Sequence, residues 1–339
     1  MTGPDTSAET QLEAFTQALC DELLQRPEPF VIVTCDATLS FRLGRFAQLH
    51  PEHVVDVGIA EATAVAAAFG LARAGLRVVV AGFAAFLSLR ALEPLRSLVA
   101  LHRADVTVLA GMTGLSAGRD GVQHQATEDA ALVRAVPGVE IVAPSDAASA
   151  RALAAHCAAN PGPRWVRLVR RPVTLRHVAS DTSRVWPPAR WLAQGDGSVL
   201  LCAHGALCEQ AEQAAQILTD RYAVTASVLE VGRLAPPPPG LPDLLRPYPA
   251  IVACEDQTGP GALAAVLSEA LTAPHSESHA DPASGLPGSR LLRCDLTASP
   301  GSGDYGELLH AAGLTGELIA ARVAQSLVTG PGTSTGGMP

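Results

Sequence analysis

The feature that most constrains the fold is an alternation, from Phe30 onward, between short β-branched runs and alanine-rich stretches. Valine- and isoleucine-rich runs suit strands that are buried on both faces. The alanine-rich stretches suit the helices that connect such strands. The pattern therefore predicts an α/β fold with a mostly parallel sheet. The predicted strands are FVIVTC, VVDVG, RVVVAG, VTVLAG, VEIVAP and WVRLV, with helices near 61–74, 88–102 and 145–158.

The alternation weakens after Pro172 and resumes near Gly197 with SVLLCAHG, a helical stretch near 206–220, VTASVLEV and AIVACED. A chain of 339 residues is long enough for two cores of ordinary size. We therefore expect two three-layer α/β domains with mostly parallel sheets. The predicted division is an N-terminal helical lead-in (1–27), a first domain (28–180), a smaller second domain (190–328) and a disordered tail (329–339).

Bulk composition excludes several classes of protein. The formal net charge of -9 provides no basic surface for a nucleic-acid backbone. No apolar run is long enough to span a bilayer, and the first residues lack the pattern of a signal peptide, so we expect a soluble, cytoplasmic protein.

Cysteine and lysine usage narrow the chemistry further. The seven cysteines are scattered without zinc-site spacing, so no metal site is predicted on this chain and most thiols should be buried and inert. All 24 cationic side chains are arginine, which excludes Schiff-base lysine chemistry and a Walker-type phosphate loop. Carbonyl chemistry here would have to use an external electron sink.

Glu61 is the one carboxylate in the almost wholly small or apolar stretch that follows VVDVG. One interpretation is a glutamate at a helix start, where the helix dipole favours its charged form. The other is a carboxyl group in an apolar pocket, where desolvation favours the protonated form and makes it a proton donor to a bound heterocycle. The two effects oppose each other.

Two aromatic residues, Phe83 and Phe86, follow the strand RVVVAG in a chain that is only 4% aromatic. Core packing is one explanation. The other is a flat wall against which an aromatic ring could stack.

The glycine-rich segment after VTVLAG contains Asp120 and His124, which could face a shared pocket as a hydrogen-bond acceptor and a proton shuttle. A surface turn with a solvated histidine is the alternative. In WVRLVRRPV, Arg167, Arg170 and Arg171 could bind phosphate, or could be surface or interface groups.

In this order and spacing, these segments resemble the pyrimidine-binding domain of transketolases and 1-deoxyxylulose-5-phosphate synthases. The later stretch through AIVACEDQTGPGALAAVL is similar to the family's C-terminal domain, so the resemblance covers roughly residues 28–328.

The resemblance implies roles for individual residues. Glu61 would hydrogen-bond the aminopyrimidine of thiamine diphosphate and promote the imino tautomer that deprotonates the thiazolium carbon. Phe83 and Phe86 would line the aminopyrimidine pocket, and Glu61 and His124 would be the catalytic residues. Substrate would contact Asp120 through a hydroxyl, His124 near the donor carbonyl, and Arg170 and Ser40 through a phosphate.

Several positions depart from the family pattern. Leu89 stands where an aromatic residue is frequent, and Pro94 where related synthases have glutamine. Arg119 replaces a common glutamate and brings a positive charge beside Asp120. These changes leave the identity of the sugar substrates open.

The family also has a diphosphate-binding domain whose GDG motif and downstream asparagine hold Mg²⁺, and the residues before Phe30 contain neither. The resemblance therefore implies a split transketolase, in which an N-terminal-section partner subunit supplies the diphosphate and Mg²⁺ sites in an α2β2 heterotetramer. Alternatives are the β subunit of a 2-oxo acid dehydrogenase, a deoxyxylulose-phosphate-synthase-like enzyme, and a non-catalytic remnant of the fold.

Overall fold

The valine-rich runs form the centre of a seven-stranded sheet in the computed structural model, which describes residues 9–175, 186–195, 197–258, 261–272 and 289–328. The strands lie in the order β10, β5, β6, β4, β3, β1, β2, and all are parallel except the edge strand β10. Their bounds are β1 (Phe30–Thr34), β2 (Val54–Asp56), β3 (Arg77–Phe83), β4 (Val106–Gly111), β5 (Glu140–Val142), β6 (Arg164–Leu168) and β10 (Arg233–Ala235).

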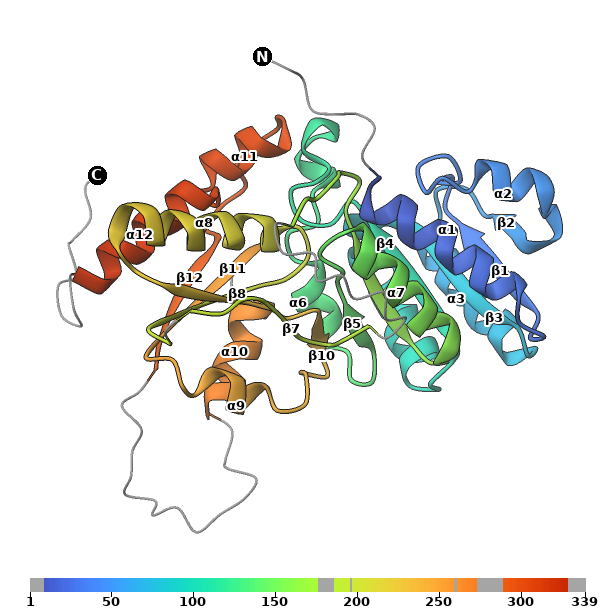
Figure 1. The fold of residues 1–339 in the computed structure, drawn as a ribbon. Coiled ribbons are helices and arrows are strands. Elements are labelled where there is room, and N and C mark those ends of the chain that lie inside the picture. The colour runs from blue at the N-terminus through green and yellow to red at the C-terminus, as the bar shows by residue number, and fades with distance from the viewer. Residues whose placement is uncertain (1–8, 176–185, 196, 259–260, 273–288, 329–339) are drawn as a thin grey trace, which may run out of the picture.

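Helices cover both faces of this sheet because successive strand residues point to opposite sides. Ile32 and Val79 pack beneath one helical layer, whereas Val33 and Val80 face the other. The first layer contains α1 (Gln11–Leu24) and α7 (Ala147–Ala159), which lie side by side in Figure 1. The second contains α3 (Glu61–Arg73), α4 (Ala84–Arg90), α5 (Leu92–Pro94), the π-helical turn η2 (Leu95–Ala100) and α6 (Asp129–Arg134).

The helix predicted near 88–102 is interrupted. The first part, α4, ends at Arg90, and the chain continues through α5 and a π-helical turn. Pro94 explains the break, because it has no backbone N–H to donate to the carbonyl of Arg90. The interruption leaves Arg90 at a helix end with its side chain half exposed.

A second, five-stranded sheet has the order β12, β11, β8, β9, β7, with only β7 antiparallel. One face packs on α8 and α12 and the other on α9 and α10 (Figure 1). The bounds are β7 (Arg190–Ala193), β8 (Val199–Ala203), α8 (Leu207–Tyr222), β9 (Ala226–Glu230), α9 (Leu241–Leu245), β11 (Ala250–Thr258), α10 (Leu263–Thr272), β12 (Arg290–Leu296), α11 (Tyr305–Ala311) and α12 (Gly316–Val328). The small helix α2 (Gly44–Leu49) lies between β1 and β2.

The predicted fold class, two α/β units with mostly parallel sheets, is confirmed. The limits of the predicted domains stay a prediction, and the tail 329–339 lies outside the described residues. The sequence pattern did not anticipate β10, which belongs to the later part of the chain yet pairs with β5 of the first sheet. No helix within the described ranges combines the length and the apolar character that crossing a membrane requires.

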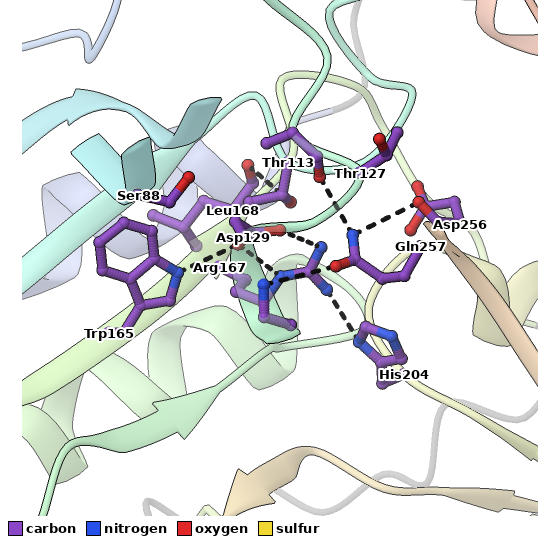
Figure 2. A network of polar contacts seen from close by, with 12 residues as sticks. Ser88, Thr113, Thr127, Asp129, Trp165, Arg167, Leu168, His204, Asp256 and Gln257 are labelled. Atoms are coloured by element: carbon purple, nitrogen blue, oxygen red, sulfur yellow. Dashed lines mark hydrogen bonds and ion pairs between the residues drawn. The ribbon is translucent and has the colours of Figure 1, made fainter. Parts of the chain in front are cut away.

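A buried polar network joins the two halves (Figure 2). Arg167 on β6 donates to both carboxylate oxygens of Asp129, over 2.9 and 3.1 Å, and the two side chains are only 3% and 0% exposed. Trp165 Nε1 donates to the same carboxylate at 3.1 Å. Arg167 also donates to Nδ1 of His204, which follows β8, at 3.0 Å. Arg167 is therefore neither a surface group nor a phosphate ligand, because its fork is already occupied.

Burial, and then the neighbouring Arg167 charge, hold the pKa of His204 well below its usual value. The ring is therefore neutral near pH 7. Because arginine can only donate, His204 Nδ1 is the acceptor and Nε2 carries the proton. Arg167, Asp129 and His204 thus form a buried group of one cation, one anion and one neutral ring.

We predict that Arg167→Met destabilises the chain by about 3 to 5 kcal/mol, because it leaves the buried Asp129 carboxylate without its cationic partner. Chemical denaturation monitored by circular dichroism would measure the loss. Arg96→Met removes an exposed arginine and should change the free energy of unfolding little.

Adding Asp129→Asn to Arg167→Met should restore part of the lost stability, since the unpaired charge is then gone. A loss below about 1 kcal/mol in the single variant would show that this ion pair contributes little to the stability of the chain.

Candidate active site

The predicted site residues all follow strands of the first sheet at their carboxyl ends, where open α/β sheets bind ligands. Glu61 follows β2, Phe83 ends β3, and Arg170 follows β6. The loop after β4 carries Asp120 and His124. Parallel pairing of these strands brings segments that are distant in sequence to one edge of the sheet.

Glu61 is the first residue of α3 and only 5% exposed. No side chain caps the helix in front of it, because the N-cap position is Ala60. Its carboxylate accepts hydrogen bonds from Nη1 of Arg90, at 3.3 Å to Oε1 and 3.2 Å to Oε2. Both sequence interpretations of Glu61 thus describe part of the site: the residue starts a helix, and it is buried.

An aromatic cluster adjoins this ion pair. The rings of Phe83 and Phe86 lie 6.1 Å apart, and the His124 ring meets both edge-on, at 5.7 and 5.1 Å between centroids. The guanidinium carbon of Arg90 lies 4.3 Å from the centre of the Phe86 ring. The structure therefore brings together Phe83, Phe86 and His124, with Glu61 linked to them through Arg90.

His124 carries a polar atom with no partner. Its Nδ1 is buried and makes no hydrogen bond within the part of the chain that the structure describes. A buried nitrogen of this kind is costly unless a ligand or water satisfies it. The orphan atom is what a ligand site at the aromatic cluster would require.

Asp120 and Arg170 face each other across a second part of the site. Arg170 Nη2 donates to Oδ2 of Asp120 at 3.2 Å, and each side chain is a little over one-third exposed. They line a cavity of about 140 Å³ together with residues 116–119 and 303–305. The two predicted substrate ligands therefore lie together and neutralise each other.

The later half of the chain closes this cavity. Arg119, the departure from the family pattern, pairs with Asp304, and its hydrogen bond lowers the pKa of that carboxyl group. Gly303 donates its backbone N–H to the carbonyl of Gly118 at 3.2 Å. The Arg119 charge is thus paired with Asp304 and not with the neighbouring Asp120.

Ser40 lies on the loop after β1 and is half buried. Among the described residues, no hydrogen bond joins its side chain to Glu61, His124 or Arg170. The neighbouring Thr38 approaches Asp56 at the end of β2, at 3.5 Å. The structure therefore puts Ser40 at the correct edge of the sheet but not in the cluster.

Sequence reasoning missed Arg90 and Asp304. Arg90 stands one position after the noted Leu89, and its spacing of four from Phe86 on one helix was an available signal, because such residues share a face. Asp304 gave no comparable signal, since it meets Arg119 across 185 positions of the chain.

The chain is similar to known proteins along most of its length. Residues 9–174 match the family described as transketolase, pyrimidine binding domain. A protein of Methanocaldococcus jannaschii named as a transketolase C-terminal section is 29% identical over 90% of this chain and 93% of its own length. A Phocaeicola vulgatus protein, named as one of the subunits of an apulose-4-phosphate transketolase, is 34% identical over 66% of this chain and 71% of its own.

Two further matches are to a longer enzyme and to a solved structure of matching length. The 1-deoxy-D-xylulose-5-phosphate synthase 1 of Kitasatospora griseola is 33% identical, and this chain spans about half (46%) of its length. A solved split-gene transketolase, described as an inactive β4 tetramer, superposes with a TM-score of 0.79 at 27% identity and covers 95% of this chain and 99% of its own.

The chain belongs to the transketolase family, a family of thiamine-diphosphate-dependent transferases. Because the relatives of matching length are themselves separate sections or subunits, it is a C-terminal-section subunit of that family.

All seven cysteines are buried, and burial raises the pKa of Cys35, which lies near Glu61, to about 12. Since the thiolate is the reactive form, we predict that a disulfide reagent such as Ellman's labels none of the seven thiols quickly in the native chain. In denaturant all seven should react. A fast-reacting thiol in the native state would show that at least one of these sites opens to solvent.

Proposed function

We propose that this chain is the pyrimidine-binding half of a split transketolase that moves a two-carbon ketol unit from a ketose or ketose phosphate to an aldose. It acts with an N-terminal-section subunit that holds most of the diphosphate and the Mg²⁺ of thiamine diphosphate. The observation that carries this proposal is the buried Glu61 carboxylate beside an aromatic wall, at the ligand-binding edge of the sheet.

The residues present fit a heterocycle. Glu61 offers a desolvated carboxyl group that can hydrogen-bond a ring nitrogen, and Phe83 and Phe86 offer apolar surface on which a flat ring can pack. When bound, the cofactor would supply the electron sink for carbon–carbon bond cleavage beside a carbonyl, which no side chain of this lysine-free chain supplies. Glu61 would hold the ring and keep a proton at its nitrogen.

His124 would serve the substrate. Its buried and unpartnered Nδ1 adjoins the same aromatic wall, so it can exchange a proton with the donor's carbonyl oxygen or neighbouring hydroxyl. The surrounding Phe83 and Phe86 exclude water from that position, which strengthens the hydrogen bond that His124 makes there.

Asp120 and Arg170 would bind the sugar. Asp120 would accept a hydrogen bond from a substrate hydroxyl, and Arg170 would turn from Asp120 to a phosphate where the sugar carries one. Ser40 would add a phosphate contact from the loop after β1. Breaking the Arg170–Asp120 hydrogen bond would thus free both side chains at once, Asp120 to bind a hydroxyl group and Arg170 to bind an anion.

The relatives of matching length support the requirement for a partner. The solved split-gene relative is described as inactive as a β4 tetramer, and the Phocaeicola relative is named as one subunit of a transketolase. We propose an α2β2 heterotetramer in the cytoplasm, in which this chain supplies the β subunits.

The 33% sequence identity to a deoxyxylulose-phosphate synthase makes deoxyxylulose-phosphate synthesis the second candidate activity. Formation of 1-deoxy-D-xylulose 5-phosphate by the complete complex would support the synthase, whereas ketol transfer between sugars would support the transketolase.

The first test is reconstitution. Titration of thiamine diphosphate and Mg²⁺ into this chain, alone and with the N-terminal-section subunit, should give strong cofactor binding and ketol transfer only in the mixture. A remnant of the fold would give no cofactor signal in either case.

The second test is Glu61→Gln, which keeps the shape of the side chain but cannot exchange a proton. Turnover of the reconstituted complex should fall by at least about 100-fold while the fold is retained, the scale of a lost acid–base contribution. Glu93→Gln, on the exposed side of α5, is the matched control and should leave turnover unchanged. Near-normal turnover in Glu61→Gln would contradict the assignment.

A further inference from the structure

Arg90 makes the two contacts that the proposed function requires of a cofactor ring. One Nη donates to both oxygens of the Glu61 carboxylate, and the guanidinium carbon lies 4.3 Å from the centre of the Phe86 ring. Hydrogen bonding to Glu61 and packing against Phe86 are the interactions assigned above to the aminopyrimidine. Nothing in the proposed reaction uses Arg90 itself.

The chemistry of the two groups explains the coincidence. A guanidinium and an aminopyrimidine are both planar, and both stack on an aromatic face. Both can also hydrogen-bond a carboxyl group in that plane: the guanidinium donates its N–H, and the pyrimidine ring nitrogen accepts from the protonated carboxyl or donates once it carries the proton. The Glu61 side chain is only 6% exposed, so its carboxylate has little open surface on which to accept a second ligand beside Arg90. The two groups therefore exclude each other.

We propose that Arg90 is a built-in occupant of the pyrimidine site, which fills it in the free chain and swings outward when the cofactor binds. This inference rests on the proposed function and adds a regulated entry step to it. Arg90 thereby controls access to Glu61 and is not a catalytic residue.

Its place in the fold allows this movement. Arg90 is the last residue of α4, before the break at Ala91, and its side chain is 52% exposed. Within the described ranges, its side chain bonds to Glu61 and packs on Phe86, and these are the contacts that release to solvent would break. Because Arg90 is half exposed, the departing guanidinium regains water, while the incoming ring takes over the hydrogen bond to the buried Glu61.

The test uses 4-amino-5-hydroxymethyl-2-methylpyrimidine, the uncharged pyrimidine fragment of thiamine, titrated calorimetrically into the full chain. Arg90→Leu removes the occupant and should tighten binding about tenfold, the combined size of a weak ion pair and a cation–π contact. Arg96→Leu removes the same charge from an exposed neighbouring position and should leave affinity unchanged.

The variant Arg90→Lys separates the effect of the charge from the effect of stacking on Phe86. Lysine keeps the charge but has no plane to stack on Phe86, so its affinity should lie between those of the wild type and Arg90→Leu. In the reconstituted complex, Arg90→Leu should lower the KM for thiamine diphosphate, and the change should fall on KM rather than on kcat.

The outcomes separate the two proposals. If the fragment binds the wild type, is lost in Glu61→Gln, and binds no tighter to Arg90→Leu, the proposed function stands and the role of Arg90 is overturned. If neither the fragment nor thiamine diphosphate binds any variant, even with the partner subunit, both proposals fall.

Discussion

The structure depends on one buried ion pair, between Arg167 of β6 and Asp129 at the start of α6. The pair joins β6, which Arg170 follows, to α6, which begins after the loop that carries Asp120 and His124. Through His204 it also attaches that region to the second sheet. Burying a charged pair is favourable only where hydrogen bonds satisfy the remaining atoms, and Trp165 and His204 supply two of them. The network therefore gives the site a fixed geometry more than it gives stability.

The sequence predicts the sheets and offers candidate site residues, but it does not show how the charges of those residues pair. Strands such as β3 and β4 are visible because buried parallel strands are continuous apolar runs, and site residues are visible because they follow strand ends. Edge strands such as β10 are only a few residues long, which is too short to show a repeating pattern of apolar residues. Pairs such as Arg119 with Asp304 bring together positions in opposite halves of the chain, which local patterns cannot reveal.

The site of the isolated chain is electrostatically self-satisfied. Arg90, Arg119 and Arg170 are each paired with a carboxylate of the same site. In the Arg119 and Arg170 pairs both side chains are more than one-third exposed, so these two pairs can exchange partners at small cost. Among the described residues, none of these three arginines is therefore an isolated charge at this edge of the sheet.

The pairing of β10 with β5 affects how chimaeras of such enzymes can be built. It comes from the later half of the chain yet covers the edge of β5, whose backbone N–H and C=O groups would otherwise be open to pairing with another molecule. A chimaera that exchanges the later half for that of a relative would also exchange this edge cover. If the new half did not cover β5, the exposed sheet edge could pair with another molecule and the chimaera would self-associate. This could happen even if every residue proposed to touch substrate had been kept.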